Sequence, residues 1–515
     1  MKNIVYFFIL LFFSFPCSLR GQGKGYHFDE RGISRQVLEN YLDRSITMVY
    51  LLMPDKPEGR RVYSYHADDM RMVKNIGAKF IGRSIYRWGG ESLLNEPEFW
   101  NKAKTLANEL HTYDPDIILQ GCLFEIVTEE VNQVKIPDWV FTGYGLPVEA
   151  RTFSYADMLN KEGRLVDHWR KGSSVPDISR LETQLWFYYL ACAYIGVGCE
   201  AFHLGQIELI GMNDPERESW AHVIGKIREY ASTHARRHWV LLDAHTPYGG
   251  MVRNGVSLLD FNSFPLRIKE IPDQPYKAEL AVGHLDALYK KSKGCVSPSG
   301  WKCEHLPYLV EFDNYGRGKE PNVADLTSHF VWGWDEISWL SLQPEDYRNE
   351  WLVYAYQWIH RTDPNGHLEM PGCRMITCPN RTEGNYRANT NSIACPFGYS
   401  QEETIKKTLE EIRKQDPKKN KRVYPIVVFG DEYDDKDVYI AYFREPDFIA
   451  FSKFVQLQKK DEIAAVRSLA HDTFIQGDKE LVDDDSLFLY GLSTKLVNII
   501  GSRQAKVANF SIAGK

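Results

Sequence analysis

The most constraining feature of this sequence is an alternation of short apolar runs with longer stretches of helical periodicity. The runs have the length of buried strands, and the stretches between them repeat apolar residues every three or four positions, as a helix with one buried face does. Strands that alternate with helices form parallel sheets, and eight of them favour a closed barrel over an open sheet. The sequence therefore predicts an α/β fold, a (β/α)8 (TIM) barrel. The eight expected strands are 46–53, 79–86, 117–127, 199–210, 239–244, 256–261, 308–312 and 330–334.

The expected barrel occupies residues 22–361, and a second part of the chain follows it. Residues 362–515 begin with a connector that is rich in Gly, Pro, Asn and Cys and has little periodicity. A helix at 402–414 and a strand at 424–429 come next. We therefore expect a C-terminal α+β extension, which either packs on the barrel or forms a small domain.

The first 21 residues have the pattern of a secretory signal peptide. Lys2 precedes an apolar run at 4–15, and small residues follow it. This run is shorter than the roughly 20 apolar residues that span a bilayer, and no later run is long enough, so we expect no transmembrane segment. We therefore expect the protein to be exported to the periplasm or the extracellular space, with residues 1–21 removed from the mature chain. Cys17 raises the alternative of a lipoprotein, which Pro16 disfavours because it makes a poor small-residue site.

Charge and cysteine content limit the class of partner and the compartment. A formal net charge of −7 argues against nucleic acid, because phosphate binding requires a basic surface. Nine cysteines become eight without Cys17, and an even number in an exported chain permits disulfides. The better bridging candidates lie in loop-like sequence: Cys295 with Cys303, and a pair among Cys373, Cys378 and Cys395. No pattern in the sequence specifies an oligomeric state.

Polar side chains gather at the expected carboxyl ends of the strands, where the catalytic groups of such barrels lie. An apolar strand that ends in charged residues is difficult to explain by packing, because a buried charge is expensive. Side chains two positions apart in a strand also share one face. The residues concerned are Arg83, Arg87, Glu125, Glu208, Asp243, His245, Asp260, Asn262, Glu311, Asp313, Asp335 and Glu336.

Two carboxyl groups that face one cavity can hydrolyse a glycosidic bond. One, kept protonated by its surroundings, donates a proton to the leaving oxygen, while the other attacks the anomeric carbon or activates water. Aromatic rings beside them would pack against the C–H faces of a sugar, and aromatic residues make up 13% of the chain. The sequence thus predicts an enzyme that cleaves an oligo- or polysaccharide without a cofactor or metal. Trp88, Trp332, Trp334 and Trp339 fall at or near strand ends.

Glu208 and Glu311 follow the fourth and seventh expected strands. By this placement the barrel region resembles the retaining (β/α)8 glycoside hydrolases, although no motif of one named family is present. The resemblance implies that Glu208 is the acid/base and Glu311 the nucleophile. The fourth-strand acid of that group usually follows an Asn, whereas Ile207 precedes Glu208 here. For substrate binding and orientation we expect Asp243, His245, Asp313, Arg87 and Glu336, with Trp332 and Trp334 stacking on the sugar.

Other readings of the same residues stay open. His203, Asp243 and His245 fall on neighbouring strands, as the ligands of a metal-dependent barrel hydrolase would. The chain could also be a non-catalytic carbohydrate-binding barrel that keeps its aromatic residues. Asp335 and Glu336 could cap the helix that follows them instead of binding substrate.

Overall fold

The computed structural model describes residues 25–29, 32–53, 65–379, 384–415, 423–431, 434–444, 446 and 448–501. The expected signal peptide at 1–21, with Cys17, lies outside these residues. The chain divides into two compact units, Met1–Leu409 and Glu410–Lys515, and each is described by itself. This division falls later than the boundary expected at Arg361, because residues 366–375 contribute strands to the first unit.

The centre of unit 1 is an α/β structure with two sheets, whose strands are parallel except for the edge strand β18. The larger sheet has the order β18 (Asn385–Arg387), β17 (Met370–Met375), β1 (Ser45–Met48), β2 (Phe80–Ile85), β3 (Ile118–Cys122), β6 (Ala201–His203) and β7 (Leu241–Asp243). The smaller sheet has the order β10 (Asn262–Pro265), β15 (Tyr308–Glu311) and β16 (Gly366–Leu368).

Two links connect these sheets. His245, which follows β7, forms a parallel bridge with Ser263 of β10. On the other side β16 pairs with β15, and β17, which begins at Met370, pairs with β1. The parallel pairing therefore follows chain order from β1 to β17, and the carboxyl ends of the strands lie at one edge. Ligands of α/β proteins bind at this edge.

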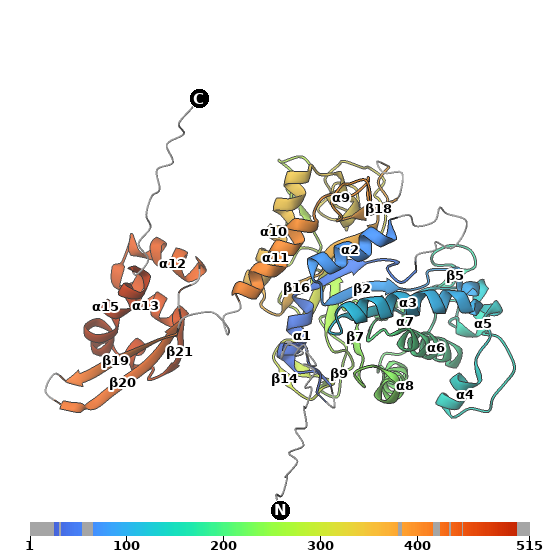
Figure 1. The fold of residues 1–515 in the computed structure, drawn as a ribbon, viewed down its shortest axis with the longest axis horizontal. Coiled ribbons are helices and arrows are strands. Elements are labelled where there is room, and N and C mark those ends of the chain that lie inside the picture. Colours follow the sequence, from blue (N-terminus) through green and yellow to red (C-terminus); the bar gives the residue numbers. More distant parts are fainter. Residues whose placement is uncertain are drawn as a thin grey trace, which may run out of the picture. The chain divides into compact units, whose positions relative to one another are not determined.

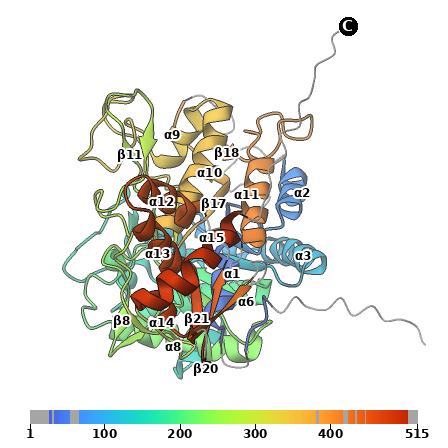
Figure 2. The same ribbon diagram turned by 90° about the vertical axis from the view of Figure 1, so that its left-hand side faces the viewer.

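Helices connect most of the strands (Figure 1). Between β2 and β3, α3 (Pro97–Tyr113) buries Ala103, Ala107 and Leu110 on one face, the periodicity expected of a helix that covers a sheet. The helices α2 (His66–Ile76) and α11 (Glu402–Gln415) lie side by side (Figures 1 and 2), joined by an Arg71–Glu402 ion pair at 2.7 Å. The other long helices are α1 (Arg35–Leu42), α6 (Leu181–Val197), α8 (Glu218–His234) and α10 (Glu345–Thr362).

Short elements occupy the connections of unit 1. They are η1 (Glu91–Asn95), β4 (Val127–Thr128), η2 (Glu129–Gln133), α4 (Asp138–Tyr144), α5 (Tyr155–Met158), β5 (Ser173–Ser174), α7 (Ile207–Ile210), β8 (Val252–Arg253), β9 (Val256–Ser257), β11 (Lys269–Glu270), β12 (Ala278–Glu279), β13 (Cys295–Val296), β14 (Lys302–Cys303) and α9 (Glu336–Leu342).

Cys295 and Cys303 face each other across β13 and β14, and both thiols are free. Cys373, Cys378 and Cys395 form no disulfide with one another either.

The structure corrects three of the expected strands. The eighth strand at 330–334 is wrong: these residues form turns, and Trp332 has a φ of 51°. The last parallel strand is β17 instead, within the segment expected to be a connector. The sixth strand begins at Asn262, because 256–257 belong to a small side sheet. The run at 199–210 is split, since β6 ends at His203 and α7 follows.

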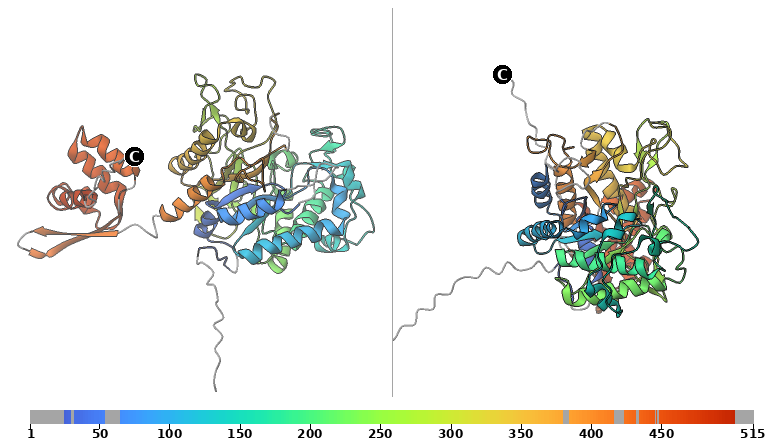
Figure 3. Two further views of the ribbon diagram at one scale, coloured as in Figure 1. Left: turned by 45° about the horizontal axis from the view of Figure 1, so that its top comes forward. Right: turned by 90° about the vertical axis from the view of Figure 1, so that its right-hand side faces the viewer.

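Unit 2 is an α+β structure with its own core. Ile426, Val428, Ala441 and Phe443 of the sheet pack with residues of the helices, such as Leu469. The helices lie on one face of the sheet (Figures 1 and 3). None of the helices in the described part of the chain has the length and apolarity that a bilayer crossing needs. The elements are β19 (Val423–Asp431), β20 (Asp434–Arg444), α12 (Phe448–Gln458), α13 (Glu462–Thr473), β21 (Phe474–Gly477), α14 (Glu480–Asp483), η3 (Leu487–Leu492) and α15 (Ser493–Gly501).

Candidate active site

Glu311, the last residue of β15, carries a tightly held carboxylate at the carboxyl edge. Arg83 of β2 binds it with two nitrogens: Nε lies 2.8 Å from Oε2, and Nη2 contacts Oε1. His245 Nε2 lies 3.0 Å from Oε1, and Arg374 Nη2 lies 3.6 Å from Oε2. Because an ionised carboxylate only accepts hydrogen bonds, His245 donates its Nε2 proton. Two guanidinium groups and an imidazole therefore fix the orientation of Glu311.

Arg83 reaches Glu311 from an unusual backbone conformation. Its φ of 57° lies in the left-handed region, although the residue belongs to β2. The pairing of β2 with β3 shifts register between Ile81 and Ile85, and the Arg83 backbone N–H donates to Gln120 Oε1 at 3.1 Å. Irregular pairing of this kind aims a side chain in a new direction, and such strain gathers at functional sites.

A small cavity of about 10 Å³ lies beside Glu311, close to the smallest space that holds one water molecule. At its wall Asp243 accepts hydrogen bonds from Gln120 Nε2 and His203 Nδ1, both at 2.7 Å. Burial raises the pKa of Asp243 to about 7 and holds the pKa of His203 well below its usual range. The cavity is lined by Arg83, Gln120, His203, Asp243, Ser263, Leu309, Glu311 and Glu369.

Asp313 supplies a second negative charge two residues after Glu311. Burial alone would raise the pKa of Asp313, but His245, Arg374 and two further arginines hold it below its ordinary value. Arg374 Nη2 lies 3.5 Å from Asp313 Oδ1, while its Nε donates to the Phe312 carbonyl at 3.0 Å. Asp313 is therefore ionised at neutral pH.

Glu125 follows β3 and brings another carboxyl group to the end of β6. Gln206 donates its backbone N–H to Oε2 at 2.9 Å and its side-chain amide to Oε1 at 3.3 Å. Gly205, with a φ of 62°, leaves room for this group, because a side chain there would collide with Oε2 of Glu125. Glu125 is buried, and burial raises its pKa.

Aromatic rings lie next to Glu125. Trp88 is 43% exposed and makes edge contacts with Phe124 and Trp169, at ring-centre distances of 5.3 and 5.2 Å. The Arg83 guanidinium lies 5.5 Å from the ring centre of Phe124, and Trp169 Nε1 donates to the Glu125 carbonyl at 2.9 Å. These three rings, here called the aromatic wall, therefore join the site to the surface.

Glu208, the expected acid/base, lies in α7 and not at the end of a strand. Its two oxygens each lie 2.7 Å from Nη2 of Arg217, and its side chain is 33% exposed. It is not among the residues that line the cavity with Glu311. The expected placement is wrong because the chain turns at Gly205, where the Glu125 carboxyl occupies the space.

Three expected substrate-binding residues are engaged elsewhere. Arg87 donates both Nε and Nη2 to the Gly90 carbonyl, at 3.2 and 2.8 Å. Trp332 and Trp334 are each 5% exposed, and their Nε1 atoms donate to the Lys277 carbonyl and to Asn322 Oδ1. Their faces are covered by protein, so stacking on a sugar does not fit this burial.

Glu336 is a structural carboxylate. It begins α9, is fully buried, and accepts backbone N–H groups of Arg267 at 2.7 Å, Ile268 at 3.3 Å and Asp313 at 3.0 Å. Burial raises its pKa to about 7. Asp335 caps the same helix by accepting from the Ser338 N–H at 2.8 Å. The capping alternative therefore holds for Asp335, whereas the Glu336 carboxyl group binds backbone N–H groups outside the helix.

His203, Asp243 and His245 do not converge as metal ligands. His203 Nδ1 pairs with Asp243, whereas His245 Nε2 pairs with Glu311. The two rings meet edge to face at a centre distance of 4.8 Å. Within the described residues, the ligand atoms of a different set of side chains meet, those of Asp43, His360 and His367.

Sequence reasoning missed Arg374 and Glu369, which lie in the segment expected to be a connector. Met370–Met375 contains Pro371 and Gly372, residues that usually interrupt strands, so its pairing with β1 left little local signal. Gln120 had a signal: it is the polar residue inside the apolar strand β3.

No family model and no curated protein matches the chain. Solved structures with which it shares similarity include a cyclic α-maltosyl-(1→6)-maltose hydrolase from Arthrobacter globiformis, at 12% identity, 79% coverage of this chain, 90% of that chain and a TM-score of 0.43. The debranching enzyme of Nostoc punctiforme is similar at 10% identity, 79% and 86% coverage and a TM-score of 0.36. A GH27 β-L-arabinopyranosidase from Geobacillus stearothermophilus is similar at 12% identity, with 73% of this chain and 78% of that chain covered and a TM-score of 0.32. At TM-scores below 0.5 these structures do not establish the function of this chain.

Proposed function

We propose that this protein is a glycoside hydrolase and that Glu311 is its nucleophile. The observation that carries the proposal is the carboxylate of Glu311, fixed by Arg83, His245 and Arg374 at the carboxyl edge of parallel strands. A glycosidase nucleophile must be ionised and must point at one carbon atom of the substrate. The guanidinium groups favour the ionised form, and the three partners together restrict its direction.

We assign the general acid to Glu125 in place of Glu208. A general acid must carry its proton near neutral pH, and burial raises the pKa of Glu125. Its carboxyl group lies against Gly205 at the end of β6, the fourth strand of the parallel series. The retaining mechanism needs carboxyl groups about 5–5.5 Å apart, whereas inversion needs about 6.5–9.5 Å. We propose retention, with Glu125 acting first as acid and then as base.

The substrate would enter over the aromatic wall. Trp88 offers an exposed ring for the C–H face of a sugar, and the neighbouring Phe124 and Trp169 support it. Asp313 and His245 would bind hydroxyl groups of the sugar, because one is ionised and the other is neutral at pH 7. An oligo- or polysaccharide is the substrate class that this combination favours.

The architecture belongs to the same proposal. We propose that the two sheets of unit 1 close into a (β/α)8 barrel, supported by the His245–Ser263 bridge and by the double pairing of residues 366–375. We also propose that the protein is exported, because residues 1–21 have the pattern of a signal peptide.

The decisive experiment screens the mature chain against aryl glycosides and polysaccharides, and then compares three variants on the best substrate. Glu311→Ala abolishes turnover, and azide restores it with formation of a glycosyl azide of inverted configuration, since azide replaces the missing nucleophile. Glu125→Ala lowers turnover about 10²–10⁴-fold on substrates with poor leaving groups. Its azide product retains configuration, because azide then attacks the glycosyl enzyme.

The matched control is Glu208→Gln, which removes an ion pair with Arg217 and keeps turnover. If Glu208→Gln abolishes activity while Glu125→Ala does not, the acid assignment reverts to Glu208. Turnover that a chelator abolishes would support the metal-dependent hydrolase. Glycan binding without turnover in every assay would support the non-catalytic barrel.

A further inference from the structure

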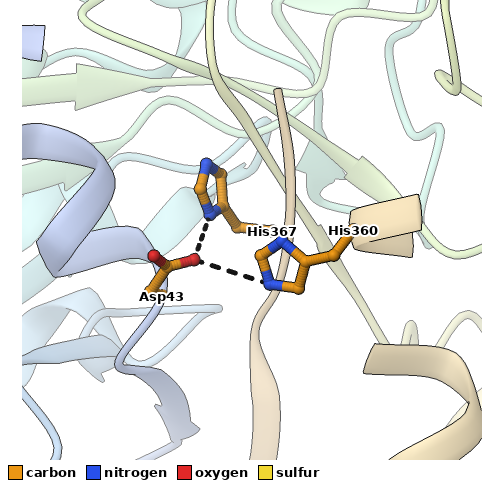
Figure 4. A group of neighbouring side chains, drawn as sticks. All are labelled: Asp43, His360 and His367. Atoms are coloured by element: carbon orange, nitrogen blue, oxygen red, sulfur yellow. Dashed lines mark hydrogen bonds and ion pairs between the residues drawn. The ribbon is translucent and has the colours of Figure 1, made fainter. Parts of the chain in front are cut away.

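A second cluster of polar side chains lies at the opposite end of the strands from Glu311. Asp43 precedes β1, His367 lies in β16, and His360 lies in the last turn of α10. The three residues come from three elements that are distant in sequence, and their side chains meet in Figure 4. The glycosidase proposal gives this cluster no role.

The ligand atoms of the cluster converge on one point. Nδ1 of His367 lies 2.7 Å from Oδ1 of Asp43, and Nε2 of His360 lies 3.5 Å from the same oxygen. All three atoms lie within 4.8 Å of one another. Figure 4 shows both ring nitrogens pointing at that oxygen. The planes of the two rings are almost perpendicular, at 86°.

The negative charge of Asp43 lacks a strong positive partner. In the described part of the chain it forms ion pairs with these two histidines and with no lysine or arginine. Its neighbour Arg44 donates instead to the carbonyl of Gly77, at 2.7 Å and 3.0 Å. Asp43 is also the C-cap of α1, where the helix dipole disfavours an anion. A cation at this position would offset both effects.

Burial leaves polar atoms at this cluster without a hydrogen-bond partner among the described residues. Among the described residues, Nε2 of His360 makes no hydrogen bond, and neither does the buried hydroxyl of Tyr356, whose ring lies 4.5 Å from that of His360. Buried polar atoms of this kind normally have a partner.

We propose that Asp43, His360 and His367 bind one divalent transition metal ion, with Zn²⁺ as the best-suited ion. Two imidazole nitrogens and one carboxylate oxygen match the preference of Zn²⁺, whereas Ca²⁺ and Mg²⁺ prefer oxygen ligands alone. Water or the Tyr356 hydroxyl would complete a tetrahedral set. The ion would link Asp43, just before β1, to His367 in β16 and His360 in α10, and would so stabilise the fold.

The test uses the full mature chain after treatment with EDTA. Zn²⁺ binding is measured by calorimetry, Co²⁺ binding by its visible absorption, and thermal stability with and without Zn²⁺. We expect the wild type to bind one Zn²⁺ more than His360→Gln does, to give the intense Co²⁺ bands of a tetrahedral site, and to gain Tm on Zn²⁺ addition. His360→Gln serves as the main variant because the Nε2 atom that it removes makes no hydrogen bond among the described residues.

Asp43→Asn is the second variant, since it keeps an acceptor for His367 Nδ1 and removes the charge. Each variant should weaken this site at least about 100-fold, the upper range for changes that only support a metal ligand. His234→Gln, an exposed histidine of α8, is the control and should bind like the wild type. Equal stoichiometry, Co²⁺ spectra and Tm gain in the wild type and both variants would overturn the proposal. Chelation is expected to leave glycosidase turnover unchanged, so this test can fail independently of the proposed function.

Discussion

At the scale of single residues, Arg83 is the residue on which the site depends most. Its left-handed φ of 57° costs roughly 1–3 kcal/mol for a residue other than glycine. We predict that Arg83→Lys lowers kcat about 10²-fold or more with little change in KM, because one ammonium cannot replace the two-nitrogen contact that orients Glu311. Steady-state kinetics on the best substrate checks this expectation.

The effect of substitution on the free energy of unfolding separates the role of Arg83, which lies in β2, from that of Arg87, which follows β2. Arg83→Met leaves a buried carboxylate without its main partner, which costs about 3–5 kcal/mol in the free energy of unfolding. Arg87→Lys is the control, because among the described residues the Arg87 guanidinium donates to the Gly90 carbonyl and lies over the ring of Phe99, away from Glu311. Equal kcat values for Arg83→Lys and Arg87→Lys would show that the two-nitrogen contact of Arg83 with Glu311 is unimportant for turnover.

The raised pKa of buried Asp243 predicts that the stability of the protein depends on pH, and burial determines the sign of this dependence. Its pKa rises from an ordinary 3.8 to about 7 in the folded protein. Between these values the folded chain holds a proton that the unfolded chain releases, so the group makes stability fall as pH rises from about 4 to 7. The slope reaches about 1.4 kcal/mol per pH unit at most.

Urea unfolding of the wild type and Asp243→Asn at pH 4.5, 6 and 7.5 measures this contribution. The variant keeps an acceptor for His203 Nδ1 but cannot ionise, so we expect it to gain on the wild type steadily as pH rises. A difference between the two proteins that is the same at all three pH values would contradict the raised pKa.

At the scale of elements, α9 holds the loops around the site through Glu336. Its carboxylate accepts three backbone N–H groups, from Arg267, Ile268 and Asp313. We predict that Glu336→Ala destabilises the protein by at least about 1–3 kcal/mol, the cost of one buried donor left unpaired. It should also lower turnover, since Asp313 loses its anchor. Thermal unfolding and kcat check both effects, and the exposed Glu345→Gln should stay within about 0.5 kcal/mol of the wild type.

The sequence pattern found the elements whose pairing agrees with their local composition. β2, β3, β7 and β15 are apolar runs, and their positions were predicted because buried parallel strands need continuous apolar residues. The residues at their ends, Asp243, His245, Glu311 and Asp313, followed from that. Turn geometry and sheet pairing hid the rest: Gly205 ends β6 early, and β17 forms a strand despite Pro371. Glu125 and Arg374 could be assigned only once these neighbours were known.

At the scale of the whole molecule, the two units carry separate cores. Unit 2 buries Phe443, Leu469 and Phe488 within itself. The residues that hold Glu311 all lie in unit 1, as do Glu125 and the aromatic wall. A chain whose parts each bury their own apolar residues can lose one part without unfolding the other.

Truncation at two positions tests this division. A chain that ends at Gln415 keeps α11, whose Glu402 binds Arg71 at 2.7 Å and Asn75 at 2.6 Å, and it keeps Glu369 and Arg374. We predict that it folds with one thermal transition and retains full turnover. A chain that ends at Arg361, the boundary expected from composition, loses β16 and β17 and with them Arg374. It should therefore be inactive and largely insoluble. If the chain that ends at Gln415 loses activity while circular dichroism shows its fold intact, unit 2 contributes to catalysis.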